Sequence, residues 1–340
     1  MGGHIYFVNP RGIVVGSQGS INAGQLTAVT PTQDFVNNFF IGGVPQQTSV
    51  DALINGTAPI NTKAAIVNNG VMSTIGTAVL TAGVITNTGS IVSGSPDIPS
   101  MFTLNADKMN LVGELNGYNG TANINKLSNG NIEIVRTKSP TCTALQLTPS
   151  ELDTVNAKYL NIQAKDINIL TNVDKMKTNN LYLMASNNVN IKGNVTVNDN
   201  FLASGVNGVF INPSTTITAN NDSVYLTSSN FKISLGQGVN LNAKNDTTLV
   251  AHTDVNVGKS SIFTAGRDII MTAGRNVTLS CYDRLTAGRN IIQTGVRAVN
   301  IGGKVTEKAG QDINLTGHCI NIDKTVKLTA GGKITKTYLK

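Results

Sequence analysis

Four arginine residues near the end of the chain are spaced in a way that could bind anions. Arg267 and Arg289 are 22 residues apart, and so are Arg275 and Arg297. If the backbone repeats every 22 residues, each pair stacks on neighbouring repeats and presents a short column of guanidinium groups. A guanidinium donates paired hydrogen bonds to sulfate, phosphate and carboxylate groups. The four residues therefore form a candidate anion-binding stripe.

The alternative for this stripe is structural. The four arginines could be solvated corner residues whose charge is partly neutralised by Asp268, Asp283 and Asp312. If the stripe binds a ligand, the classes to consider are sulfated glycans, lipopolysaccharide and nucleic acid. Nucleic acid is the least favoured, because no aromatic side chains interleave with the charges.

Catalytic chemistry finds little support in the sequence. Polysaccharide hydrolases need one carboxyl as acid and another as base close together, whereas the acidic residues here are dispersed. The histidines, His4, His252 and His318, lie far apart, and no GxSxG motif occurs. The GKSS run at 258–261 is no phosphate loop, since Thr253 replaces its first glycine. We therefore expect neither an enzyme nor a cofactor or metal site.

The three cysteines, Cys142, Cys281 and Cys319, are isolated and show no CxxC or metal-ligand spacing. We expect no disulfide framework, and we expect each thiol to be a small buried or half-buried side chain.

Positive charge is concentrated in the last quarter of the chain. Residues 1–258 carry 13 Lys and Arg against 14 Asp and Glu, whereas residues 259–340 carry 13 against 5. The net charge is thus −1 in the first part and +8 in the second. The basic character of the protein belongs to the segment that contains the stripe.

An internal repeat predicts how these residues are positioned. Four segments align with a period of 22, 22 and 21 residues: TAGRDIIMTAGRNVTLSCYDRL (264–285), TAGRNIIQTGVRAVNIGGKVTE (286–307), KAGQDINLTGHCINIDKTVKL (308–328) and TAGGKITKTYLK (329–340). Each holds short strands with alternating apolar residues, separated by glycine-containing corners. Repeats of this length indicate a solenoid. Weaker copies at 245–260, 179–197, 157–170 and 64–92 extend the same pattern upstream.

The predicted fold class is therefore all-β: a right-handed parallel β-helix with extra-helical excursions. Coils of about 21 residues give roughly 14–16 coils at strand spacing, with under a tenth of the chain helical. Charged residues make up only 13% of the chain, Trp is absent and Gly is frequent. This composition suits a narrow aliphatic core with Asn and Thr ladders at the corners.

Two stretches of the sequence do not follow the repeat pattern. Residues 30–47 concentrate Phe and Pro, and residues 116–156 contain Asn-Gly turns and an ordinary charge content. We expect both to lie outside the regular coils, with one helical turn in 148–155. The domain prediction is coils at 1–115 with an excursion at 30–47, an irregular join at 116–156, and a repeat rod at 157–340.

The first turn has a defined chemistry. In Asn9-Pro10-Arg11-Gly12, Asn is at position i, Pro at i+1 and Gly at i+3, which are the preferences of a type I turn. The Asn side chain is expected to cap the backbone.

The surrounding sequence IYFVNPRGIVVGSQGSINAGQLTAVT resembles the secretion domain of two-partner secretion exoproteins, the filamentous haemagglutinin type of adhesin. The matching residues are Asn9, Pro10, Gly12, Ile13, Ile21, Asn22, Gly24 and Leu26. Arg11 stands where the family often has Asn, and Gln25 where it has a second Gly. The segments TPTQDFVNNFF, LTPSELDTVNAKYLNI (147–162) and TAGRDIIMTAGRN (264–276) are similar to further family segments in the same order.

The resemblance implies a secreted, non-catalytic adhesin-type exoprotein at the bacterial outer surface, exported by an outer-membrane transporter. Asn9, Pro10, Arg11, Gly12, Ile13 and Asn22 would shape the surface that the transporter reads, and a host or bacterial surface ligand such as an anionic glycan would be the second partner. No signal peptide precedes the first strand, so a longer protein or a protein without its own leader is expected.

Two alternatives stay open for the function. One is a structural or assembly β-helix protein without its own export signal, and the other is a polysaccharide-active β-helix enzyme. We also expect self-association through residues 1–15, because GGHIYFV is apolar whereas the other end carries Lys333, Lys336 and Lys340.

Overall fold

The structure is a computed structural model that describes residues 2–340. The chain divides into unit 1, which comprises Met1–Ile132 and Thr137–Ile162, and unit 2, which comprises Glu133–Arg136 and Gln163–Lys340. Strands account for 53% of the chain and helices for 5%, and parallel sheets stack as a β-solenoid of about 15 turns. The predicted fold class, a parallel β-helix with excursions, is confirmed, as are the coil number and the low helix content.

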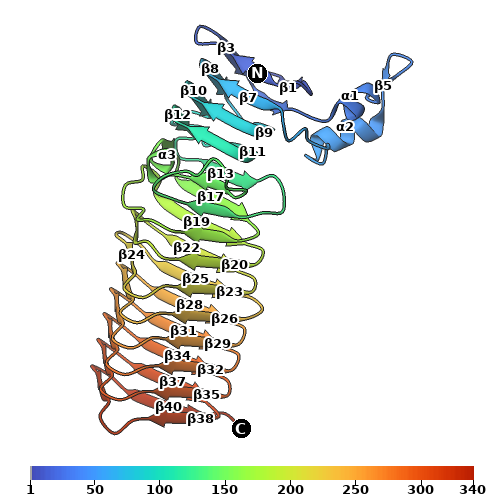
Figure 1. The fold of residues 1–340 in the computed structure, drawn as a ribbon. Helices are drawn as coiled ribbons and strands as arrows, with labels where there is room; N and C mark the ends of the chain where they lie inside the picture. The colour runs from blue at the N-terminus through green and yellow to red at the C-terminus, as the bar shows by residue number, and fades with distance from the viewer. Residues whose placement is uncertain (1) are drawn as a thin grey trace. The chain divides into compact units, whose positions relative to one another are not determined.

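Unit 1 contains two parallel ladders (Figure 1). The strands of the first are β1 (His4–Val8), β4 (Gln25–Val29), β9 (Ala78–Asn87), β11 (Met101–Leu111) and β13 (Thr121–Lys126), with β2 (Ile13–Val15) and β7 (Ala65–Asn68) joined through β9. The strands of the second are β3 (Ser20–Ala23), β8 (Val71–Thr74), β10 (Ser90–Ser93), β12 (Glu114–Asn116) and β16 (Val155–Asn156). Its other elements are α1 (Gln33–Asn37), β5 (Phe40–Ile41), β6 (Val44–Pro45), α2 (Gln47–Ile54), β15 (Leu145–Leu147) and α3 (Pro149–Asp153). Strands β14 (Ile132–Ile134) and β17 (Tyr159–Ala164) contain residues of both units.

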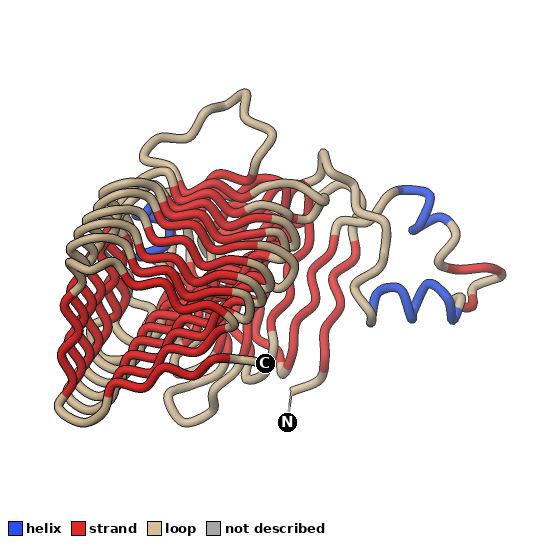
Figure 2. The backbone as a smooth tube through the Cα atoms, turned by 90° about the horizontal axis from the view of Figure 1, so that it is seen from below, coloured by secondary structure: helices blue, strands red, loops and turns tan. Residues whose placement is uncertain are grey.

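Unit 2 stacks three parallel ladders, whose strands form layers joined by loops in Figure 2. Ladder 1 consists of β19 (Asn180–Ala185), β22 (Phe201–Gly205), β25 (Val224–Ser228), β28 (Thr247–Ala251), β31 (Ile269–Ala273), β34 (Ile291–Gly295), β37 (Ile313–Gly317) and β40 (Ile334–Tyr338). Ladder 2 consists of β18 (Ile167–Ile169), β20 (Asn188–Ile191), β23 (Gly208–Ile211), β26 (Lys232–Leu235), β29 (Asp254–Val257), β32 (Asn276–Leu279), β35 (Ala298–Ile301) and β38 (Cys319–Ile322). Ladder 3 consists of β21 (Val195–Val197), β24 (Thr216–Ala219), β27 (Asn240–Ala243), β30 (Ile262–Ala265), β33 (Arg284–Ala287), β36 (Thr306–Ala309) and β39 (Lys327–Ala330).

The repeat seen in the sequence is the coil of the solenoid. Ile269 pairs with Ile291, Ile291 with Ile313, and Ile313 with Ile334, so equivalent residues stack at steps of 22, 22 and 21. Side chains alternate along each strand because successive Cβ atoms point to opposite faces. The inward positions hold mainly Val, Ile, Leu and Ala, and the aromatic side chains Phe201 and Phe263 are fully buried among them.

The excursion at residues 30–47 extends further than the sequence indicated. The chain leaves the coils at Pro31 and returns at Ile60, where these two residues form a bridge. Between them lie α1, the β5–β6 hairpin and α2, which project from the coils of unit 1 in Figures 1 and 2. The Thr32 hydroxyl caps α1 by accepting the N–H of Phe35 at 3.4 Å.

The prediction that all of 116–156 leaves the coils is wrong for its four strands. β13 pairs with β11 over six residues and β16 pairs with β12, while β14 and β15 are hydrogen-bonded neighbours in another sheet. The ordinary charge content of this stretch suggested a loop, but its charges are compatible with a strand. The ammonium nitrogen of Lys126 in β13 is buried 2.6 Å from a carboxylate oxygen of Asp107 in β11. In this stretch, the parts that depart from the coil pattern are the segments connecting these strands and the helix α3.

The helical turn predicted in 148–155 is α3, and a buried glutamate holds it. Thr148 and Glu151 form a capping box in which each side chain accepts the other's backbone N–H. The second oxygen of Glu151, Oε1, accepts the N–H of Leu111 at 2.9 Å and the ammonium of Lys138 at 2.5 Å. One carboxylate thus ties the helix to β11 and to the preceding loop.

A side-chain ladder satisfies the backbone at the corner before ladder 1. At this corner the side-chain oxygen of one coil accepts a backbone N–H of the next coil, at 2.7–3.3 Å. The acceptors, in order, are Asn180, Asn200, Ser223, Asp246, Asp268, Asn290 and Asp312. We call this set the corner column. A side-chain ladder is thus present at a corner as predicted, but it is built from Asn, Asp and Ser and contains no Thr.

Removing one member of the corner column should destabilise unit 2. Asn290→Ala leaves the N–H of Asp312 without its side-chain acceptor, so we expect a loss of about 1–2 kcal/mol in the free energy of unfolding. Asn314→Ala is the matched control, because Asn314 lies on an outward position of β37. Denaturant unfolding followed by circular dichroism measures both, and equal losses would contradict a special role of the corner.

Candidate functional site

The four stripe arginines stack as the repeat predicts. The N–H of Arg289 donates to the carbonyl of Arg267 at 2.8 Å, and the N–H of Arg297 donates to that of Arg275 at 2.8 Å. The first pair lies at the corner before ladder 1 and the second at the corner before ladder 2. The structure thus contains two columns at two corners, not one continuous stripe.

Three of the four guanidinium groups are engaged by carboxylates of the preceding coil. Arg267 and Arg289 donate through both Nε and Nη2 to Asp246 and Asp268, with Nε distances of 3.1 and 3.0 Å. Arg275 donates through Nη2 to Asp254. The hydrogen bonds from Arg289 lower the pKa of Asp268, although partial burial acts in the opposite direction.

The carboxylates that neutralise the stripe differ from those expected. Of the three expected acids only Asp268 pairs with an arginine, whereas Asp283 is buried and Asp312 accepts the N–H of Lys333. The Asp and Arg of each observed pair are 21 residues apart, which is one residue fewer than the 22-residue coil. That spacing in the sequence would have identified the pairs.

Arg297 differs from the other three. In the described part of the chain it forms no ion pair, because Asn276 occupies the position that corresponds to Asp254 one coil earlier. Its side chain is exposed. Of the stripe residues, Arg297 is therefore the one whose charge is free for an outside anion.

The Asn9–Gly12 turn has the backbone hydrogen bond and the Asn side-chain cap expected from its sequence. The N–H of Gly12 donates to the carbonyl of Asn9 at 3.3 Å, and the Oδ1 atom of Asn9 accepts the N–H of Arg11 at 3.0 Å. Gly12 has a φ of +123°, and a Cβ there would lie 2.8 Å from the carbonyl oxygen of Ala65. A glycine is therefore required at this position.

A second contact fixes the turn from outside. The amide of Asn61, at the end of the excursion, donates to the carbonyl of Pro10 at 2.7 Å. The side chains of Asn9 and Arg11 remain exposed. Two other residues assigned to this surface lie on strands, because Ile13 begins β2 and Asn22 lies in β3. The turn is thus a rigid element with two exposed polar side chains.

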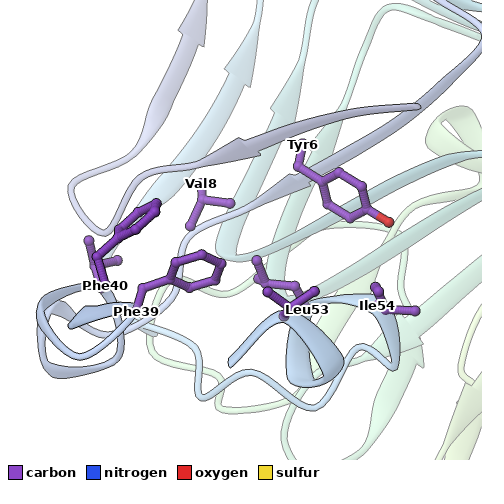
Figure 3. Close-up of a pocket in the computed structure, with 8 residues that line it drawn as sticks. Tyr6, Val8, Phe39, Phe40, Leu53 and Ile54 are labelled. Carbon is purple, nitrogen blue, oxygen red and sulfur yellow. The ribbon is translucent and has the colours of Figure 1, made fainter. Parts of the chain in front are cut away.

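An apolar groove lies between β1 and the excursion (Figure 3). Its volume is about 380 Å³, and the residues that line it are Tyr6, Val8, Val36, Phe39, Phe40, Val50, Leu53 and Ile54. Two of these, Phe40 and Ile54, are more than half exposed. No sequence pattern indicates this groove, because the groove forms only where residues of α2 lie beside residues of β1.

Strand β1 forms one side of this groove and is open at its other edge. Among residues 2–340 it pairs only with β4. Ile5, Tyr6 and Phe7 are each more than a third exposed, and no charged residue interrupts the strand. Exposed apolar edges without charges are templates for pairing with another strand.

Two carboxylic acids lie inside unit 2, where sequence reasoning placed only apolar residues. Glu307 is fully buried and accepts the amide N–H of Gln293 at 2.5 Å. Burial raises the pKa of Glu307 to about 7, even though this hydrogen bond lowers it in part. Burial also raises the pKa of Asp283 to about 7, although hydrogen bonds from the backbone N–H groups of Ser261 and Ser280 lower it in part.

The cysteines are free, as expected. Cys142 is half-buried, but Cys281 and Cys319 are exposed, so the expectation of buried or half-buried thiols is wrong for these two. Cys281 lies in a turn, and Cys319 begins β38.

Comparisons with known proteins return no match: no protein-family model, no curated protein and no solved structure matches this chain. No described helix is long and apolar enough to cross a membrane. Within residues 2–340, no three His, Cys, Asp or Glu side chains are grouped so that they could hold a metal ion.

The buried acids predict that stability falls as pH rises. The folded-state pKa of Glu307 lies above its unfolded value, so its contribution is fully present below about pH 4.5 and is lost as the pH rises through about 7. Glu307→Gln should flatten this decline and make the variant more stable than the parent at pH 8, by up to about 3 kcal/mol. Denaturant unfolding from pH 5 to 8 measures both slopes; parallel curves would contradict the assignment.

The open edge of β1 predicts self-association. Replacing Ile5 and Phe7 together by Lys should reduce the mass measured by light scattering at high protein concentration, because charged residues oppose strand pairing. Val250→Lys is the control, since Val250 is also exposed but its strand β28 is paired on both sides. A monomeric parent chain would contradict the prediction.

Proposed function

We propose that this chain belongs to a secreted, non-catalytic exoprotein. The exoprotein would be located on the bacterial outer surface and attach to other surfaces. We further propose that an outer-membrane transporter of the two-partner type exports it by reading the Asn9–Gly12 turn. The observation that carries this proposal is the turn itself. It is held from inside by Asn9 and Gly12 and from outside by Asn61, yet Asn9 and Arg11 remain exposed.

The rigidity of the turn supports a recognition role. A partner that binds a preorganised turn loses little conformational entropy, so the exposed side chains of Asn9 and Arg11 can contribute most of their interaction energy to binding. The resemblance of the surrounding motif to the secretion domain of haemagglutinin-type exoproteins supports the same role.

The coil structure of unit 2 supports passage through a transporter. Each coil contacts mainly its neighbours, and solenoids of this kind can fold by adding one repeat to the next. A chain that emerges in extended form can therefore fold outside the transporter coil by coil. The corner column supplies the next N–H acceptor each time a coil is added.

Surface attachment is proposed for the basic part of unit 2. Residues 259–340 carry a formal net charge of +8, and Arg297 has no ion pair among the described residues. Attraction of this region to negatively charged surface polymers follows from its sign of charge.

Export tests the proposal directly. The chain is placed behind a cleavable export signal and expressed with a two-partner transporter, and protein in the medium is measured. Replacing Asn9 and Pro10 together by Ala should abolish release, because both the turn conformation and an exposed side chain are lost. The purified double variant should keep the strand-type circular dichroism spectrum of the parent.

The control replaces Ser17 and Gln18 by Ala, in another exposed turn of unit 1. This variant should be released like the parent. Normal release of the Asn9 and Pro10 variant would refute transporter recognition and leave the turn with a structural role only.

A further inference from the structure

The outward face of ladder 3 carries basic residues that the arginine spacing did not reveal. Arg284 in β33, Lys308 in β36 and Lys327 in β39 are all exposed. They alternate with inward residues such as Leu285 and Glu307, so their side chains point away from the core.

The register sets the arrangement of these three charges. Arg284 pairs with Thr306 and Thr306 with Lys327, so Arg284 and Lys327 lie in one column two coils apart, roughly 10 Å. Lys308 lies in the adjacent column of the intervening coil. The cations therefore follow a zigzag along the stacking direction.

No carboxylate competes for these cations on the same face. From β27 to β39 the other outward residues of ladder 3, all within the described chain, are Asn240, Asn242, Ile262, Thr264, Thr286, Thr306 and Thr329. The acidic residue of these strands, Glu307, points inward. None of the three cations takes part in an ion pair of the described residues.

One corner extends the positive face, because Lys304 precedes β36 there. At the other corner, Arg267 and Arg289 are paired with Asp246 and Asp268. Lys304 is exposed, with its ammonium 5.0 Å from the ring centre of Tyr282 and 3.3 Å from the phenol oxygen. Two of the five acids of residues 259–340, Asp283 and Glu307, are buried inside, so they contribute little negative charge to this surface.

We propose that this face of ladder 3 binds a linear polyanionic polysaccharide, with its chain along the stacking direction and its anionic groups on Arg284, Lys308 and Lys327. The inference rests on the proposed attachment function and names its ligand class and site. Charge complementarity supplies the attraction, and the Thr and Asn side chains between the cations supply hydroxyl and amide groups for sugar hydroxyls. A nucleic acid fits less well, because the positions between the cations carry no aromatic rings for base stacking.

The test uses the purified full chain and dextran sulfate, with unmodified dextran of the same length as the neutral probe. The chain should bind dextran sulfate and not dextran. Replacing Arg284, Lys308 and Lys327 together by Thr should weaken binding at least tenfold. The slope of log affinity against log salt concentration should become shallower by about 2, because fewer counterions are released.

The control removes the same charge elsewhere in unit 2, by replacing the exposed cations Lys165, Lys177 and Lys192 by Thr. This variant should stay within about twofold of the parent. An equal loss in both variants would show that only net charge matters and would overturn the assigned face. Tighter binding to a DNA duplex than to dextran sulfate would overturn the polysaccharide assignment.

These binding measurements need no transporter. A result that contradicts the polysaccharide site is therefore distinguishable from a result that contradicts the proposed export. Circular dichroism and thermal unfolding of both triple variants establish that each is folded. A parent chain that binds neither dextran sulfate nor dextran would overturn the proposed ligand class while leaving the transporter test unaffected.

Discussion

The structure of unit 2 depends on the hydrogen bonds that join one coil to the next at the corner before ladder 1. Backbone groups pair with neighbouring coils within the ladders and also at parts of this corner, as the N–H of Arg289 does with the carbonyl of Arg267. One N–H of each coil at the corner is instead bonded to a side-chain oxygen of the corner column. Buried or half-buried N–H groups without an acceptor are costly, so these short polar side chains determine which coil positions lie above one another.

The same corner determines how the charged residues can act. A carboxylate in the column, such as Asp246 or Asp268, has a free second oxygen that attracts the guanidinium of the next coil. Arginines at corners are therefore engaged within the protein, whereas cations on the strands of ladder 3 have only Thr, Asn and Ile beside them. Position within the coil thus separates cations that stabilise the stack from cations available to a partner.

Much of this architecture could be predicted from the sequence, because the TAGR segments repeat at the length of one coil and their apolar residues alternate. The strand β13 was missed because Lys126 and nearby Asn-Gly pairs suggested a loop, and only the structure shows its charge paired with Asp107. Glu307 was missed although the aligned repeats place it between Leu285 and Leu328, in an inward column. The apolar groove had no comparable signal, since it forms between residues brought together only when the excursion folds.

The spacing of the hydrogen bonds in the corner column limits how the length of such a chain can change during evolution. Its seven hydrogen bonds connect residues that are 20 to 23 positions apart, and the last four of them 21 or 22. Insertion or loss of one whole coil leaves every remaining acceptor opposite a donor, whereas insertion of part of a coil at the corner would separate the acceptor of one coil from its donor in the next. Genes for this kind of solenoid are therefore expected to lengthen and shorten in whole-coil steps, with insertions of other lengths confined to outward excursions such as the one between Pro31 and Ile60.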